Sequence, residues 1–251
     1  ANSKTLISST PVLSDVWREF ADQYNLDLDD LVRFFDVTYV QLHNSHGKRT
    51  NENLAERIPQ LTPEQAQSEA ERFEARIIEL SDENHTKATS PPTAANPQGT
   101  IVGLPGVKEL LAQINAGSKP DNHGWAVVTS ATGDYARKAL RSTRVSDLPP
   151  VFVSSDDVQN GKPHPQPYLM GSEMSKKDIS KCIVVEDAPA GVLSGKRAGA
   201  RVLACMTTHG AERLWKNGAD YVVKDLSCVS AKWENGQVVL TINSELRPNL
   251  A

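Results

Sequence analysis

The sequence of 251 residues has little cysteine, no strong excess of either charge and no long apolar run. Its three cysteines, Cys182, Cys205 and Cys228, form no CxxC pair, which argues against a disulfide framework or a structural zinc site. The low cysteine content favours a reducing, cytoplasmic setting. We expect two of the cysteines, Cys182 and Cys205, to be small core residues because they lie beside strand-like runs. The net charge of −4 lacks the positive excess expected of a protein that binds nucleic acid or an anionic membrane.

No apolar run approaches the ~20 residues that a membrane span needs. The first residues also lack the basic-then-apolar layout of a secretory signal. With 39% hydrophobic residues the chain has an ordinary globular composition. We therefore expect a small-molecule ligand rather than nucleic acid or a membrane as the partner. The sequence does not indicate an oligomeric state.

From about residue 100 onward, short apolar runs alternate with segments of helical period. The runs WAVVTS, VFVSS, CIVVED, RVLACMT and DYVVKD read as buried strands, and each is followed by a helical or turn segment. This alternation predicts an α/β fold, a doubly wound parallel sheet with helices on both faces. In the tail, Asn235-Gly236 between two strand-like runs predicts a β-hairpin.

A block of helical pattern without strand alternation precedes this region. Thr62 and Gln65 form a capping-box pattern at the start of one helix, and DLDDLVRFFDVTYVQLH repeats the apolar period of another. The stretch NHTKATSPPTAANPQGT reads as a loop. We predict a helical cap over 14–88, a flexible connector over 85–100, and a core made of 1–13 and 100–251.

Three predicted strands end in groups that carry chemistry. Ser130 and Ala131 follow one strand, where a hydroxyl and free backbone N–H groups at a helix entry can bind phosphate. Lys162 lies in a proline-stiffened loop and suits neutralisation of an anion. Glu186 and Asp187 end a third strand, and adjacent buried carboxylates favour a cation, best a hard one such as Mg²⁺.

Each of these signals also has an ordinary structural explanation. A serine before a helix is usually an N-cap, and a loop lysine is often simply solvated. Of two neighbouring acids, one can cap a helix while the other faces water. Taken in this order along this predicted fold, the three signals together are far more specific than any one of them.

Together with ISSTP, SHGKRT, SGKRAGA and GADYVVKDL, these motifs resemble the haloacid dehalogenase superfamily. They are most similar to its fungal-type sugar- and polyol-phosphate phosphatases, such as glycerol-phosphate and deoxyglucose-phosphate phosphatases. The resemblance spans nearly the whole chain and implies a Rossmann-like core with an inserted helical cap.

The resemblance also implies roles for single residues. Ser130 and Ala131 match the phosphate-binding turn, and Lys162 the lysine that stabilises the nucleophile and the phosphoryl charge. Glu186 and Asp187 match the acidic pair of a Mg²⁺ site. Lys162 and Asp187 match catalytic groups of the family that are still present in this sequence.

In the predicted cap, HGKRT matches the substrate-specificity turn of these phosphatases. The match suggests that Arg49, and also His46 or Lys48, face the ligand. A solvated basic turn is the alternative explanation.

The first motif of that superfamily, Asp-x-Asp-Gly-Thr, is not found where the resemblance places it. Ala1 stands at the nucleophile position, Ser3 at the acid/base position and Lys4 at the glycine, so only Thr5 matches. Alanine cannot form the aspartyl-phosphate, serine is a poor proton shuttle, and a Mg²⁺ site lacking one carboxylate should bind weakly or be lost. We also expect no apolar strand before the motif, since the sequence given shows none, and KWENGQVVLTI is a candidate to replace it.

Three hypotheses follow from this degenerate motif. The preferred one is an enzyme derived from phosphate monoesterases that now acts on a small molecule in the cleft between core and cap, without phosphatase activity. The second is a Mg²⁺-dependent sugar or polyol phosphatase whose N-terminal motif is truncated or altered in this sequence. The third is a non-catalytic protein that binds a phosphate ligand or regulates another. Whether the chain is an enzyme is left open by the sequence.

Overall fold

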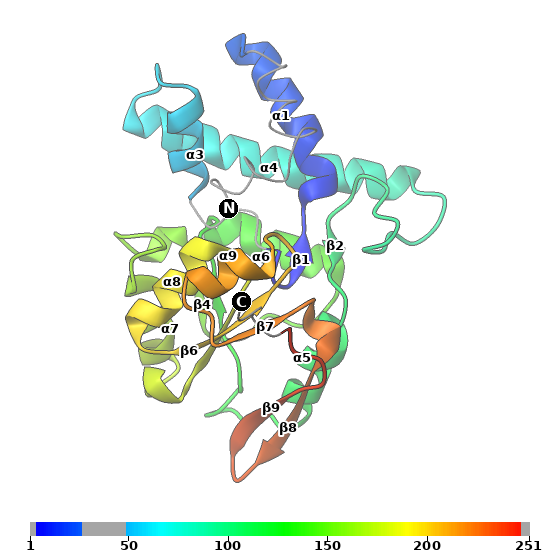
Figure 1. Ribbon diagram of the computed structural model, residues 1–251. Coiled ribbons are helices and arrows are strands. Elements are labelled where there is room, and N and C mark those ends of the chain that lie inside the picture. The colour runs from blue at the N-terminus through cyan, green and yellow to red at the C-terminus, as the bar shows by residue number, and fades with distance from the viewer. Residues whose placement is uncertain (1–3, 27–48, 247–251) are drawn as a thin grey trace.

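The computed structural model describes residues 4–26 and 49–246 (Figure 1). Its parallel strands are β3 (Val127–Val128), β4 (Phe152–Val153), β5 (Ile183–Glu186), β6 (Arg201–Cys205) and β7 (Tyr221–Val223). The helices that accompany them are α5 (Val107–Ala116), α6 (Gly133–Thr143), α7 (Gln166–Met174), α8 (Pro189–Ala198) and α9 (Ala211–Lys216).

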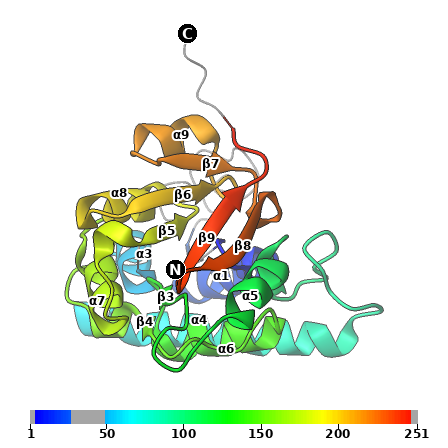
Figure 2. The same ribbon diagram turned by 90° about the horizontal axis from the view of Figure 1, so that it is seen from below.

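The parallel strands form two hydrogen-bonded groups. β3 pairs with β4, and β5, β6 and β7 form a three-stranded sheet in that order. The strands are apolar and mostly buried, as expected for a sheet with helices on its faces (Figure 2). The predicted α/β class with a doubly wound, Rossmann-like core is confirmed.

Two further strand pairs are antiparallel. β1 (Ile7–Ser8) pairs with β2 (Val102–Gly103), and β8 (Val229–Glu234) pairs with β9 (Gln237–Ile242). Positive φ values of 49° at Asn235 and 75° at Gly236 give the turn expected of this dipeptide, so the predicted hairpin is confirmed.

The hairpin does not replace a first strand of the parallel sheet. Within the described residues β8 and β9 pair only with each other, and the hairpin packs on α5, where Nε1 of Trp233 donates to the carbonyl of Ile114. Its strands are only partly buried, so they do not suit the centre of a sheet that is covered on both faces. The candidate role inferred for this segment from the sequence was therefore wrong.

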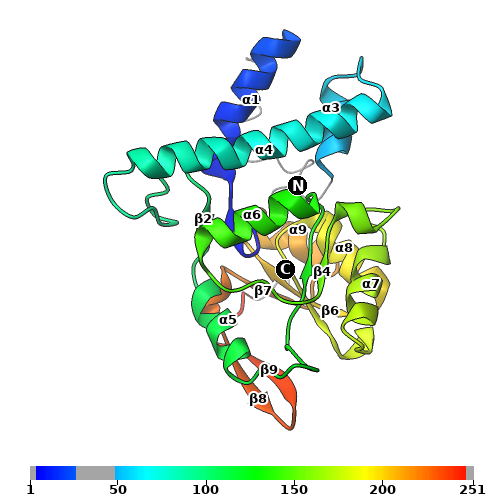
Figure 3. The same ribbon diagram turned by 180° about the vertical axis from the view of Figure 1, so that it is seen from behind.

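Three helices lie together on one side of this core (Figures 1 and 3): α1 (Thr10–Tyr24), α3 (Thr50–Arg57) and α4 (Pro63–Lys87). Phe73 of α4 packs against Trp17 and Phe20 of α1, with ring centroids 4.7 and 4.8 Å apart. The predicted capping box is present, since Thr62 and Gln65 exchange side-chain-to-backbone hydrogen bonds. The helix expected from DLDDLVRFFDVTYVQLH lies outside the described residues, and the boundaries 14–88 and 85–100 remain a prediction.

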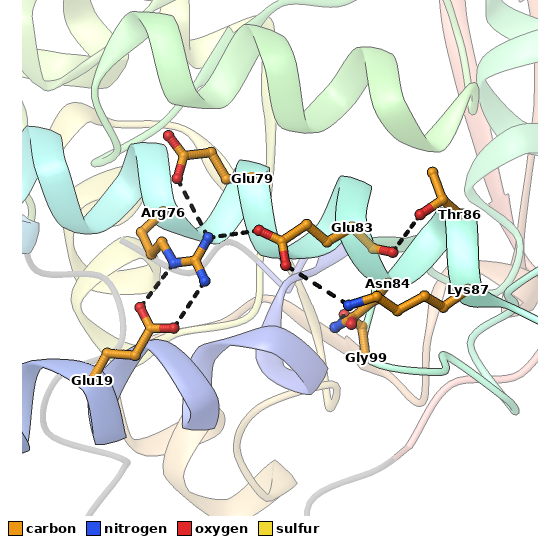
Figure 4. A network of polar contacts seen from close by, with 8 residues as sticks. All are labelled: Glu19, Arg76, Glu79, Glu83, Asn84, Thr86, Lys87 and Gly99. Carbon is orange, nitrogen blue, oxygen red and sulfur yellow. Dashed lines mark hydrogen bonds and ion pairs between the residues drawn. The ribbon is translucent and has the colours of Figure 1, made fainter.

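The loop predicted from Asn84 onward begins later than expected. α4 continues to Lys87, and within its last turn Asn84 donates to the carbonyl of Gly99, 2.9 Å away. Farther back on the same helix, Arg76 forms a two-pronged pair with Glu19 of α1, at 2.8 and 2.9 Å, and also reaches Glu83 (Figure 4). The pair with Glu19 links α4 to α1, whereas Asn84 links the last turn of α4 to the chain before β2.

The cysteines are all free, but they differ in burial. Cys205 is fully buried in β6, as predicted, whereas Cys182 is only half-buried because it precedes the first residue of β5. The expectation that Cys182 is a core residue was thus wrong. No helix among the described residues is both long enough and apolar enough to cross a membrane.

Substituting Gly106 and Gly236 separately by alanine tests the packing of the loop before α5. Both residues have positive φ, 78° and 75°, so each substitution costs about 1 kcal/mol of backbone strain. A Cβ at Gly106 would lie 2.1 Å from the backbone nitrogen of Ser227, whereas one at Gly236 meets nothing within 4 Å. In urea unfolding we expect Gly106→Ala to lose about 2–4 kcal/mol and Gly236→Ala about 1. Equal losses would contradict this close approach.

Candidate active site

Lys162 joins the two groups of parallel strands at their carboxyl ends. Its ammonium donates to Oε1 of Glu186, 2.7 Å away at the end of β5, and to the main-chain oxygen of Val128, 3.0 Å away at the end of β3. The side chains of Lys162 and Glu186 are almost fully buried. The lysine and the glutamate that the sequence singled out separately therefore form one buried ion pair.

Glu186 is held by more than this lysine. The hydroxyl of Tyr168 on α7 donates to Oε1 at 2.5 Å, and Oε2 accepts from the backbone N–H groups of Asp187 and Ala188 at 3.0 and 3.3 Å. Burial by itself would raise the pKa of Glu186, but the charge of Lys162 and these donors outweigh it and lower the pKa. Glu186 is thus a charged, fully partnered structural group.

Asp187 lies in a different environment, although it is the next residue. Oδ1 accepts from the Thr5 hydroxyl at 2.6 Å, and Oδ2 accepts from the Thr208 hydroxyl. Nδ1 of the buried His209 is 3.2 Å from the main-chain oxygen of Asp187 and donates to it. Burial, followed by the charge of Glu186, raises the pKa of Asp187 to about 6.

Lys4 approaches this carboxylate from the N-terminal segment. Its neighbour Thr5 is bonded to Asp187, and its own main-chain oxygen accepts from the hydroxyl of Thr207 in the loop after β6. Burial lowers the pKa of the Lys4 ammonium, while the charge of Asp187 acts in the opposite direction. A lysine is therefore placed beside the acid that the resemblance assigns to a metal.

The turn after β3 differs from expectation in one respect. Ser130 and Ala131 are buried there, as a phosphate-binding turn would require. The backbone N–H groups expected to be free are already bonded: Ala131 donates to Thr129, Thr132 to Glu74 and Gly133 to Asp156. The prediction of free amides was wrong, because carboxylates from two other elements cap the start of α6.

Arg49 lies against the loop that carries Lys162. Its Nη2 donates to the main-chain oxygen of Val158 at 2.6 Å, and a Cβ added to Gly161 would lie 2.9 Å from Nε. Nε is buried and has no hydrogen-bond partner within the described part of the chain. Ala1, Ser3, His46 and Lys48 lie outside the described residues, so their predicted roles remain predictions.

The described residues do not form a ready cluster of protein ligands for Mg²⁺. Both oxygens of Glu186 are occupied by donors, and both oxygens of Asp187 accept hydroxyl hydrogen bonds. In 4–26 and 49–246 no group of three or more His, Cys, Asp or Glu side chains is placed to hold a metal ion. Mg²⁺ is commonly held by one or two carboxylates together with waters and a phosphate, so Asp187 is the described acid that would hold it once the two threonine hydroxyls turn away.

Sequence reasoning did not find Tyr168, Thr208, His209 or Glu74. Tyr168 follows three prolines in the loop motif and could have been noted as a buried hydroxyl. Thr208 and His209 follow a predicted strand end, which is where ligands gather. Glu74 had no signal, because one glutamate in a helix rich in glutamates looks like a solvated charge.

Two curated relatives of this chain are named as phosphatases. The chain is 32% identical to glycerol-1-phosphate phosphohydrolase 1 of Saccharomyces cerevisiae over 228 residues, which cover 88% of this chain and 78% of that protein. It is 28% identical to 2-deoxyglucose-6-phosphate phosphatase 2 of the same yeast, over 96% and 93% of the two chains. The sequence motifs had suggested both of these kinds of phosphatase as relatives.

A solved structure supports the fold. The crystal structure of a hydrolase from Pseudomonas syringae matches with a TM-score of 0.65 over 89% of this chain and 90% of that one, at 23% identity. The model of the haloacid dehalogenase-like hydrolase family matches residues 4–205, which include the acidic pair, Lys162 and Ser130. The chain therefore belongs to the haloacid dehalogenase-like hydrolase family.

Proposed function

We propose that this chain binds the phosphate monoester of a small sugar or polyol, with the phosphoryl group between Lys162 and Ser130. The observation that carries the proposal is the position of Lys162, a buried ammonium held at the carboxyl ends of two strands. Two of its three N–H donors bind protein oxygens, and we assign the third to a phosphoryl oxygen. The yeast relatives, which act on glycerol 1-phosphate and 2-deoxyglucose 6-phosphate, support this ligand class.

We infer that the chain as given binds such an ester without forming an aspartyl-phosphate. Ala1 and Ser3 stand where the family resemblance places the nucleophile and the acid/base, and neither carries a carboxylate. Without a nucleophile the covalent route is lost, while binding groups elsewhere in the site keep their affinity. The hypothesis of a phosphatase with an altered N-terminal motif predicts that restoring the motif restores turnover.

A second candidate function is acid–base catalysis on a small molecule that carries no reacting phosphate. Asp187 favours it, because a carboxyl with a pKa of about 6 is suited to exchanging protons near neutral pH. Its two hydroxyl donors, Thr5 and Thr208, hold the carboxyl in one orientation. The free cysteines and the sequence composition support a reducing, cytoplasmic location for either function.

Ser130→Ala tests the binding site without removing a buried charge. In calorimetric titrations the unchanged chain is expected to bind inorganic phosphate and glycerol 1-phosphate, and Ser130→Ala to bind each about 5- to 10-fold more weakly. The control is Ser142→Ala, which removes an exposed hydroxyl of α6 that donates to the carbonyl of Ala139. Absence of binding by the unchanged chain would refute the proposed function.

Restoring the motif tests catalysis. With Mg²⁺ and a panel of sugar and polyol phosphates, the unchanged chain is expected to release no phosphate above background. The triple variant Ala1→Asp, Ser3→Asp, Lys4→Gly should gain at least about 100-fold over background, because it supplies a nucleophile and a proton shuttle. The matched control carries Asn at positions 1 and 3. Turnover by the unchanged chain that Asp187→Asn abolishes would show a competent phosphatase and contradict our inference.

The raised pKa of Asp187 predicts a pH-dependent gain from Asp187→Asn in metal-free buffer. An acid whose pKa is higher in the folded state loses its contribution to stability as pH rises from about 4 to about 6. Relative to the unchanged chain, the variant should therefore gain about 2 kcal/mol between pH 4.5 and 7.5 in urea unfolding. Asp134→Asn, at an exposed acid of α6, should show no such gain. A flat difference for Asp187→Asn would mean that its pKa is not raised.

A further inference from the structure

Glu74 is a buried carboxylate in the middle of α4, outside the acidic pair at the strand ends. Its exposed fraction is 2%, although most neighbouring charges on this helix face solvent. Removing a carboxylate from water costs free energy, so a buried carboxylate is usually met by several hydrogen-bond donors. In Figure 3, α4 crosses the core beside α6, so a side chain from the middle of α4 can reach the start of α6.

Among the described residues, Glu74 accepts hydrogen bonds from two different turns. Oε1 accepts from the Thr50 hydroxyl at 2.5 Å, and Oε2 accepts from the backbone N–H of Thr132 at 3.2 Å and from the Thr132 hydroxyl. Thr50 directly follows Arg49, and Thr132 comes two residues after Ser130. One carboxylate therefore binds both the turn that presents Arg49 and the turn that presents Ser130.

The contact also replaces a local helix cap. Thr132 is the N-cap residue of α6, yet its side chain makes no capping bond to its own helix. Its hydroxyl and its amide are instead directed to Glu74, which places a negative charge at the positive end of the helix. The conformation of the Ser130 turn thus depends on a residue of α4 and not only on its own sequence.

We propose that Glu74 is a positioning residue that fixes the Arg49–Thr50 turn relative to the Ser130–Thr132 turn, so that a phosphate ester is bound across both. The inference rests on the proposed function, in which Ser130 and Lys162 hold the phosphoryl group. Arg49 packs against the loop that carries Lys162. The phosphoryl group of the ester then meets the Ser130–Thr132 turn, and its alcohol part meets the Arg49–Thr50 turn. An ester should depend on this link more strongly than inorganic phosphate does, because inorganic phosphate engages Lys162 and the Ser130 turn but has no alcohol part to meet the Arg49–Thr50 turn.

Glu74→Gln tests the proposal, because the glutamine side chain keeps the shape of glutamate but replaces one acceptor oxygen with an NH₂ group. That group faces the donors of either Thr50 or Thr132 and cannot accept their hydrogen bonds. Calorimetric titration should show glycerol 1-phosphate bound about 10-fold more weakly and inorganic phosphate weakened no more than about threefold. The matched control is Glu71→Gln, which makes the same charge change at an exposed site on the same helix. Thr132→Val should reproduce the loss, and Thr132→Ser, which keeps the hydroxyl, should not.

Hydrogen exchange of the ligand-free protein gives a second measurement. Amides of both turns, 49–51 and 130–133, should exchange faster in Glu74→Gln than in the unchanged chain and in Glu71→Gln. Equal affinities in Glu74→Gln and the unchanged chain, or equal weakening of ester and phosphate, would refute the positioning role. Binding of neither ligand by the unchanged chain would instead refute the proposed function and the ester-binding role with it.

Discussion

The buried pair between Lys162 and Glu186 is the interaction on which the site depends. It links the end of β3 to the end of β5, two strands that belong to separate hydrogen-bonded groups. A buried ion pair stabilises a fold little by itself, because desolvation offsets the attraction, but removal of one partner leaves a buried charge and costs about 3–5 kcal/mol. The Tyr168 hydroxyl and two backbone amides complete the shell around Glu186, so the pair resists rearrangement.

The same pair explains why two neighbouring acids behave differently. Glu186 takes the ammonium and the strongest donors, which leaves Asp187 buried beside a negative charge with two hydroxyls as its partners. The pKa of one carboxyl is lowered and that of the other is raised, a separation found where acids have distinct tasks. Lys4 lies close enough to act on Asp187 electrostatically, which makes the N-terminal segment part of the site.

Much of the fold could be predicted because its signals are local. Asn235-Gly236 forms its hairpin, Thr62 and Gln65 cap their helix, and the apolar runs ending at Ser130 and Asp187 lead into the site as expected. Predictions failed where a distant residue decides the outcome. The amides of Thr132 and Gly133 are bonded because Glu74 and Asp156 reach them, and Asn84 lies inside α4 with its side chain bonded to Gly99.

The sequence by itself determined the fold class, the family and the residue types at the strand ends, since these follow from periodicity and motifs within short stretches. Only the tertiary structure decided which acid is paired, which is destabilised as an anion, and which glutamate of α4 is buried. Glu74 and Glu71 are three residues apart and chemically identical, yet one binds two turns of the site and the other faces solvent. The difference arises from packing between elements far apart in the chain, which sets the burial and the partners of each charge.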